Sequence, residues 1–155
     1  MDYFDKAETW DRATLETVQL ARLKTTIQQA SRAPFYAKRL AEAGVSADNL
    51  RSQYPYGLAT VPHSEFVRMH CSSGTTGTPV AVCYTQSDIN SWADLMARCL
   101  YMAGVRKDDV FQNMSGYGLF TGGLGIHFGA ERLGCMTIPA GAGNSKRQLK
   151  LVKDF

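Results

Sequence analysis

The chain lacks the sequence features that mark membrane-spanning, secreted and cysteine-ligated metal proteins. No apolar run approaches the roughly 20 residues that a helix needs to cross a bilayer. Residues 1–5, MDYFD, are acidic and have no apolar core, so we do not expect a secretory signal there. The four cysteines form no C-x-x-C pair. This predicts reduced thiols in a cytoplasmic protein and no metal site.

The chain also lacks a large excess of either charge. The 155 residues carry 17 Lys and Arg against 14 Asp and Glu, a net charge of +3, and the basic residues are scattered. This balance gives no reason to expect a nucleic acid or a membrane as partner. With 45% hydrophobic and 20% charged residues, the composition is that of an ordinary globular protein with a real core.

Apolar spacing and turn residues predict an α/β fold. Helices are expected over residues 10–30, 35–43, 87–104 and 122–133 and from residue 145, with Ser87 capping the third of them. Strands are expected over residues 66–71, 80–84, 110–114 and 135–138, and residues 45–62 should be irregular. The first two strands would form a β-hairpin, and the last two would be parallel strands joined by a crossover helix. We therefore expect an N-terminal helical region, residues 1–62, and an α/β region, residues 63–155.

The most informative stretch is the expected hairpin tip, residues 72–79, which reads SSGTTGTP. Glycines allow tight turns and close approach to a ligand, and hydroxyl and amide groups in such a loop can bind phosphate oxygens. The loop is not a Walker A motif, because no Gly-Lys-Ser/Thr ends it. On composition alone, an ordinary polar turn is the alternative.

Other motifs occur in a fixed order around this loop. They are APFY at residues 33–36, YPYGL at 54–58, GYGLFTGGLG at 116–125, His127, and GAERLG at 129–134. Together with SSGTTG, they resemble the phenylacetate–CoA ligase branch of the AMP-forming acyl-CoA synthetases, over nearly the whole chain. The resemblance covers the N-terminal portion of such a ligase, with residues 50–54 shortened, and implies an incomplete adenylate-forming fold.

The resemblance implies ATP-dependent activation of an aryl or arylacetic acid, phenylacetate first among them, followed by transfer to coenzyme A, with Mg²⁺ assisting. The residues that would bind the ATP phosphates are Ser72, Ser73, Gly74, Thr75, Thr76 and Gly77. Those that would line the acid pocket are Tyr117, Phe120, Gly122 and Gly123. No catalytic residue is assigned, because the family's later motifs, including its catalytic lysine, have no counterpart here. We therefore expect the isolated chain to be inactive, and to self-associate if it exposes a face that relatives cover.

Two departures from the family pattern leave alternatives open. Thr78 and Val80 flank Pro79 where many relatives carry a lysine, so the loop would hold phosphate through hydroxyls, amides and a cation. Ser115 stands where relatives often have a tyrosine, which admits benzoate, an indole-acetate or a phenylpropionate as rival substrates.

Other readings of the same residues also stay open. Tyr117 and Phe120 could be plain core residues, and His127 a packed residue or a substrate-positioning one. The turn at residues 141–144 could contact a ligand or simply join a strand to a helix. A non-catalytic nucleotide- or acyl-binding module is the alternative to a ligase. A dinucleotide-binding domain is disfavoured, because G-x-G-x-x-G fails at Thr121.

Overall fold

The computed structural model describes residues 4–39, 47–72 and 77–155. It divides the chain into two compact units, Met1–Cys83 and Tyr84–Phe155. Helices and strands occur in both units, which confirms the predicted α/β class. The predicted division into residues 1–62 and 63–155 stays a prediction. Among the described residues, every helix is too short or too polar to cross a bilayer.

Three helices precede the hairpin in the first unit. They are α1 (Arg12–Ala30), α2 (Pro34–Arg39) and α3 (Ala47–Ser52), and a short 3-10 turn, Lys6–Thr9, lies before them. Asp11 begins α1 by accepting a hydrogen bond from the Thr14 amide at 2.7 Å. The α3 helix overturns the expected irregular stretch over residues 45–62. At six residues it is too short for an apolar period to reveal it in the sequence.

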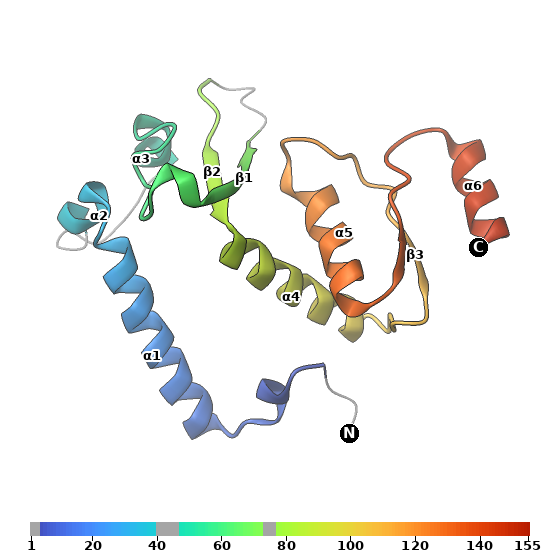
Figure 1. The fold of residues 1–155 in the computed structure, drawn as a ribbon, viewed down its shortest axis with the longest axis horizontal. Helices are drawn as coiled ribbons and strands as arrows, with labels where there is room; N and C mark the ends of the chain where they lie inside the picture. Colours follow the sequence, from blue (N-terminus) through green and yellow to red (C-terminus); the bar gives the residue numbers. More distant parts are fainter. Residues whose placement is uncertain (1–3, 40–46, 73–76) are drawn as a thin grey trace. The chain divides into compact units, whose positions relative to one another are not determined.

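The hairpin consists of β1 (Phe66–Cys71) and β2 (Ala81–Thr85), which form a two-stranded sheet. Figure 1 shows the two strands side by side. The first strand matches its prediction, and the second begins one residue later than predicted. A connection this short allows a hairpin but no crossover to a parallel strand.

The second unit begins with α4 (Gln86–Met102) and continues to α5 (Thr121–Leu133). Thr85 caps α4: its hydroxyl accepts from the Asp88 amide at 3.2 Å, and the Asp88 carboxylate accepts from the Thr85 amide at 2.8 Å. The expected cap, Ser87, is therefore wrong, because a reciprocal capping box satisfies two backbone donors where a lone serine satisfies one. Gly134 ends α5 with a φ of 96°, in the left-handed region.

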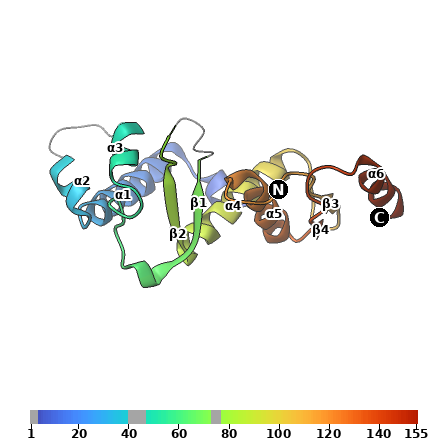
Figure 2. The same cartoon turned by 90° about the horizontal axis from the view of Figure 1, so that it is seen from above.

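Helices α4 and α5 lie side by side in both views (Figures 1 and 2), and glycines bring them together. A Cβ atom at Gly125 would lie 2.4 Å from the Trp92 ring, and one at Gly129 would lie 2.5 Å from the Met96 Cβ. The small residues Ala93 and Ala97 of α4 are buried. These four residues allow close approach of the two helix backbones, and the packing fixes the rotation of α5.

Strands β3 (Val110–Gln112) and β4 (Met136–Ile138) form a parallel pair on either side of α5 in the sequence. The register places Phe111 opposite Thr137, and Figure 2 shows the two strands side by side. This confirms the predicted strand–helix–strand unit, with strands shorter than predicted. The last helix, α6 (Ser145–Asp154), begins at Asn144, whose φ is 50° and whose side chain accepts from the Arg147 amide.

We expect Gly129→Ala to lower the free energy of unfolding of the second unit by about 1–3 kcal/mol, because an added methyl group overpacks the α4–α5 contact. Urea unfolding followed by far-ultraviolet circular dichroism measures the change. Gly118→Ala is the matched control, since nothing lies within 4 Å of a Cβ built there. Equal effects of the two substitutions would contradict this account of the packing.

Candidate functional site

Two hydrogen bonds between Ser72 and Val80 join the two sides of the hairpin at the base of the glycine-rich loop. The Ser72 amide donates to the Val80 carbonyl at 3.0 Å, and the Val80 amide donates to the Ser72 hydroxyl at 2.9 Å. Gly77 has a φ of 132°, a conformation that residues with a Cβ rarely adopt. Of the predicted phosphate-binding residues, Ser73, Gly74, Thr75 and Thr76 lie outside the described residues. Ser72 and Gly77 flank them, and the phosphate role of all six stays a prediction.

Asn113 is the organising residue of the second unit. It follows β3 and is 2% exposed. Its Oδ1 atom accepts from the Ser115 amide at 3.0 Å, while its Nδ2 atom donates to the Gly123 carbonyl at 2.8 Å and to the Tyr117 hydroxyl at 2.9 Å. A backbone amide can only donate and a carbonyl can only accept, so these partners fix the orientation of the Asn113 amide.

The backbone of Asn113 joins the same site to β4. Its amide donates to the Ile138 carbonyl at 2.9 Å, and its carbonyl accepts from the Gly141 amide at 3.1 Å. The residue thus lies at the carboxyl ends of both parallel strands, where ligands of open α/β sheets bind. The sequence analysis missed Asn113. A polar residue directly after a strand and before a glycine-rich loop was the signal that could have found it.

Tyr117 extends the Asn113 contacts to α5. Its hydroxyl lies 3.1 Å from the Nδ1 atom of His127, and His127 Nε2 lies 3.1 Å from Glu131 Oε1. The Tyr117 and His127 rings meet edge to face, with centroids 5.8 Å apart. Burial raises the pKa of Tyr117, the hydrogen bond from Asn113 lowers it in part, and the Glu131 charge raises it. His127 is therefore part of a polar chain of side chains and is not simply a packed residue.

The four residues predicted to line the acid pocket differ in burial and in their contacts. Gly123 is buried, and a Cβ atom there would lie 2.3 Å from the Gly116 carbonyl oxygen, so only glycine allows this approach. Asn113 donates hydrogen bonds to both the Tyr117 hydroxyl and the Gly123 carbonyl, and so links these two residues. Phe120 is 70% exposed at the start of α5, and its ring lies 3.1 Å from a Cβ built at Gly122. That these residues bind an acid stays a prediction.

A second amide pair supports the turn at residues 141–144. Gln148 of α6 is buried, and its Nε2 atom donates to the Gly141 carbonyl at 2.6 Å and to the Gly143 carbonyl at 3.1 Å. Gln112 Nε2 donates to Gln148 Oε1 at 2.5 Å. The turn is thereby held beside the end of β3. Sequence reasoning found the turn and missed both glutamines.

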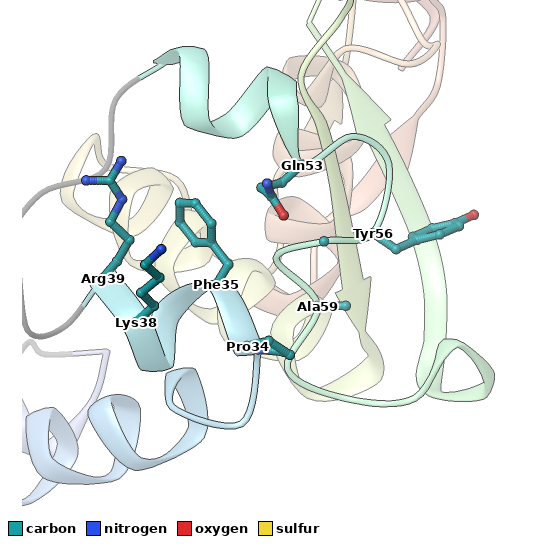
Figure 3. A pocket seen from close by; sticks show the side chains of 8 residues that line it. Pro34, Phe35, Lys38, Arg39, Gln53, Tyr56 and Ala59 are labelled. Atoms are coloured by element: carbon teal, nitrogen blue, oxygen red, sulfur yellow. The ribbon is translucent and has the colours of Figure 1, made fainter.

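The first unit contains a separate pocket of about 680 Å³, between α2 and the segment that follows α3 (Figure 3). Phe35, Lys38 and Arg39 of α2 line one side of it and Gln53 lines another. None of the residues predicted to bind nucleotide or acid lies in it. Among the described residues, no group of three or more His, Cys, Asp or Glu side chains could hold a metal ion.

Comparison with known proteins identifies close relatives. No protein-family model matches the chain. A phenylacetate-coenzyme A ligase of Pseudomonas putida is 45% identical across 97% of this chain and 38% of its own length. An enzyme of the same name from Thermus thermophilus is 42% identical across 100% of this chain. Another from Escherichia coli is 41% identical across 97% of this chain. The chain covers 39% of the length of each. The chain therefore spans about two fifths of these relatives.

Solved structures show the same relationship. A 2-hydroxyisobutyryl-CoA ligase in complex with 2-HIB-AMP and CoA superimposes with a TM-score of 0.80 and 28% identity, over 98% of this chain and 39% of that one. The same ligase in its postadenylation state, with 2-HIB-AMP, gives a TM-score of 0.78 over 94% of this chain and 35% of that one. The fold is thus that of part of an adenylate-forming CoA ligase.

We expect Asn113→Ala to destabilise the second unit, at a cost of about 1–3 kcal/mol for each buried polar group left unsatisfied. The Gly123 carbonyl and the Ser115 amide both lose their partner. Urea unfolding measures the loss. Asn90→Ala is the control, because Asn90 is an exposed amide of α4 whose side chain bonds to Gln86, and its removal should change stability by about 0.5 kcal/mol or less. An equal effect of the two variants would contradict the central role of Asn113.

The raised pKa of Tyr117 predicts a pH dependence of stability in alkali. A tyrosine of the unfolded chain ionises near pH 10, where folded Tyr117 still holds its proton. The stabilising contribution is therefore complete below about pH 10 and is lost as the pH rises through the folded pKa. Tyrosinate absorbance can be taken as the difference between wild type and Tyr117→Phe. It should rise at a higher pH in the folded protein than in urea. Coincident curves would refute the shift.

Proposed function

Since this chain belongs to the phenylacetate–CoA ligase family, we propose that the protein it represents activates an aryl or arylacetic acid, phenylacetate first among them, and transfers it to coenzyme A. The observation that carries the proposal is 40–45% identity to enzymes of that name across 91–100% of the chain. Because the chain spans about two fifths of those relatives, the complete reaction is proposed for a protein of the relatives' full length.

The proposed reaction has two steps. A carboxylate oxygen of the acid attacks the α-phosphorus of ATP and displaces pyrophosphate, and the thiol of coenzyme A then attacks the acyl carbonyl and displaces AMP. Hydroxyl and amide groups of Ser72, Ser73, Gly74, Thr75, Thr76 and Gly77 would stabilise charge on the phosphates. The closed Ser72–Val80 base supports this role, because it fixes the two ends of the loop. Mg²⁺ would be bound mainly through ATP oxygens and would neutralise phosphate charge.

The acid would bind beside the carboxyl end of β3. Tyr117 and Phe120 would supply aromatic walls, and Gly122 and Gly123 would leave room for the ligand. The half-exposed Tyr117 ring, with its hydroxyl held by the buried Asn113, supports this placement. The free cysteine thiols fit the proposed cytoplasmic location. Self-association is also part of the proposal, since Leu149 and Val152 of α6, and Phe155 directly after it, are exposed.

The alternative is a non-catalytic nucleotide- or acyl-binding module. It is favoured by one observation: the glycine loop and the Asn113 site both lie within a chain that covers only about two fifths of its relatives. Such a module would bind ATP tightly without forming an acyl-adenylate.

ATP–pyrophosphate exchange with a panel of aryl carboxylates tests the proposal. We expect no exchange by the purified chain alone. We expect acid-dependent exchange by a chimera that completes this chain with the remaining sequence of the Pseudomonas putida relative. In the chimera, replacing Thr75 and Thr76 together by alanine should lower exchange at least tenfold, while Thr9→Ala, in the exposed first turn, should not.

The outcomes separate the two candidate functions. A folded chimera that binds ATP but gives no exchange with any aryl acid would favour the binding module over the ligase. Exchange by the 155-residue chain itself would show that adenylation does not need the additional length of the relatives.

A further inference from the structure

The hydrogen bonds around Tyr117 have a defined direction. Both hydrogens of the Asn113 amide are donated, one to the Gly123 carbonyl and one to the Tyr117 oxygen. At the other end, Glu131 is a carboxylate that can only accept, so His127 Nε2 carries a hydrogen toward it. In neutral His127 the Nδ1 atom is then the acceptor. The Tyr117 hydroxyl must donate to it across 3.1 Å.

Protonation of His127 reverses the bond between Tyr117 and His127. Both ring nitrogens of an imidazolium donate, so Nδ1 must now donate to the Tyr117 oxygen. That oxygen already accepts from Asn113, so it accepts two hydrogen bonds and its own hydrogen is free to point elsewhere. Tyr117 is 38% exposed, so a ligand can approach this residue.

We propose that His127, held by Glu131, is a positioning residue for Tyr117, and that protonated His127 makes the Tyr117 hydroxyl a hydrogen-bond donor to the carboxylate of the acid ligand. This inference rests on the proposed function, since that function supplies the carboxylate. Binding of the acid to the neutral form would take up one proton from solvent onto His127 Nδ1. The imidazolium would also attract the carboxylate.

Within the described part of the chain, the polar partners of the His127 ring are Tyr117 and Glu131. Its side chain is 17% exposed, and the Phe128 ring meets it edge to face. On the side of α5 that faces α4, Arg132 pairs with Asp94. Strand β4, Met136–Ile138, contributes no ionisable side chain. The protonation state of His127, which contacts Tyr117 and Glu131, therefore sets the direction of these hydrogen bonds.

Nuclear magnetic resonance of the ¹⁵N-histidine- and ¹³C-tyrosine-labelled chain tests the relay without a ligand. We expect neutral His127 to carry its hydrogen on Nε2, and the Tyr117 ring resonance to shift as His127 is protonated. In Glu131→Gln the amide can donate as well as accept, so the Nε2–H form should lose its predominance. Glu16→Gln, which removes an exposed carboxylate of α1, should leave the tautomer unchanged. A predominant Nδ1–H form in wild type, or a Tyr117 resonance indifferent to His127, would overturn the relay.

Phenylacetate titrations of the chimera with the Pseudomonas putida relative, with and without His127→Asn, test the donor role. Binding that requires protonated His127 should weaken about tenfold for each pH unit above its midpoint. In His127→Asn the amide can donate to Tyr117 at every pH, so this dependence should disappear. Binding by wild type that is equally strong on both sides of the midpoint would overturn the donor role. Absence of phenylacetate binding at every pH, with the relay intact, would count against the acid site and hence against the proposed function.

Discussion

The buried amide of Asn113 is the contact on which the second unit depends. Asn113 follows β3 directly, and its side chain and backbone bond to the end of β4, the loop after β3, the start of α5 and the turn after β4. An amide with all its donors and acceptors satisfied is stabilising, whereas the same group with a missing partner would carry a desolvation penalty. The geometry of Tyr117 is therefore tied to the integrity of the whole unit. Any shift of β4 or α5 would break at least one bond of this residue.

The glycines of α5 allow the close helix packing that this hydrogen-bonded site requires. Gly125 and Gly129 let the helix approach α4 closely, while Gly123 lets its first turn approach the loop after β3. Because both contacts involve backbone or bulky side chains, α5 cannot rotate without a clash. Its rotation in turn places His127 beside Tyr117 and Glu131. The glycine-rich sequence of this helix thus serves packing and the polar site together.

The Asn113 hydrogen bonds and the packing of α5 position the side chains of the candidate site. The chain superimposes on part of an adenylate-forming ligase, and it contains a hairpin loop with a closed base and a polar aromatic site at the strand ends. Phosphate binding and acid binding require different chemistry, hydroxyls and amides in one case and aromatic surface with few polar groups in the other. Under the proposed function, residues 72–77 would supply the first set and residues 113–127 the second. Residues 72–77 fall within the first unit, Met1–Cys83, and residues 113–127 within the second, Tyr84–Phe155.

The sequence by itself determined the hairpin, the parallel pair around α5 and the family, because each depends on local periodicity, turn residues or a collinear set of motifs. It did not reveal α3, which is too short for periodicity, or the Thr85 cap, since Thr85 and Ser87 are both suitable capping residues and only the Asp88 bonds distinguish them. Asn113 and the link from Tyr117 to His127 required the tertiary structure. Gly123 lies 10 residues from its partner Asn113 in the chain, and His127 lies 10 residues from its partner Tyr117. Such contacts exist only once the packing of α5 on α4 and the pairing of β3 with β4 have fixed where each side chain lies.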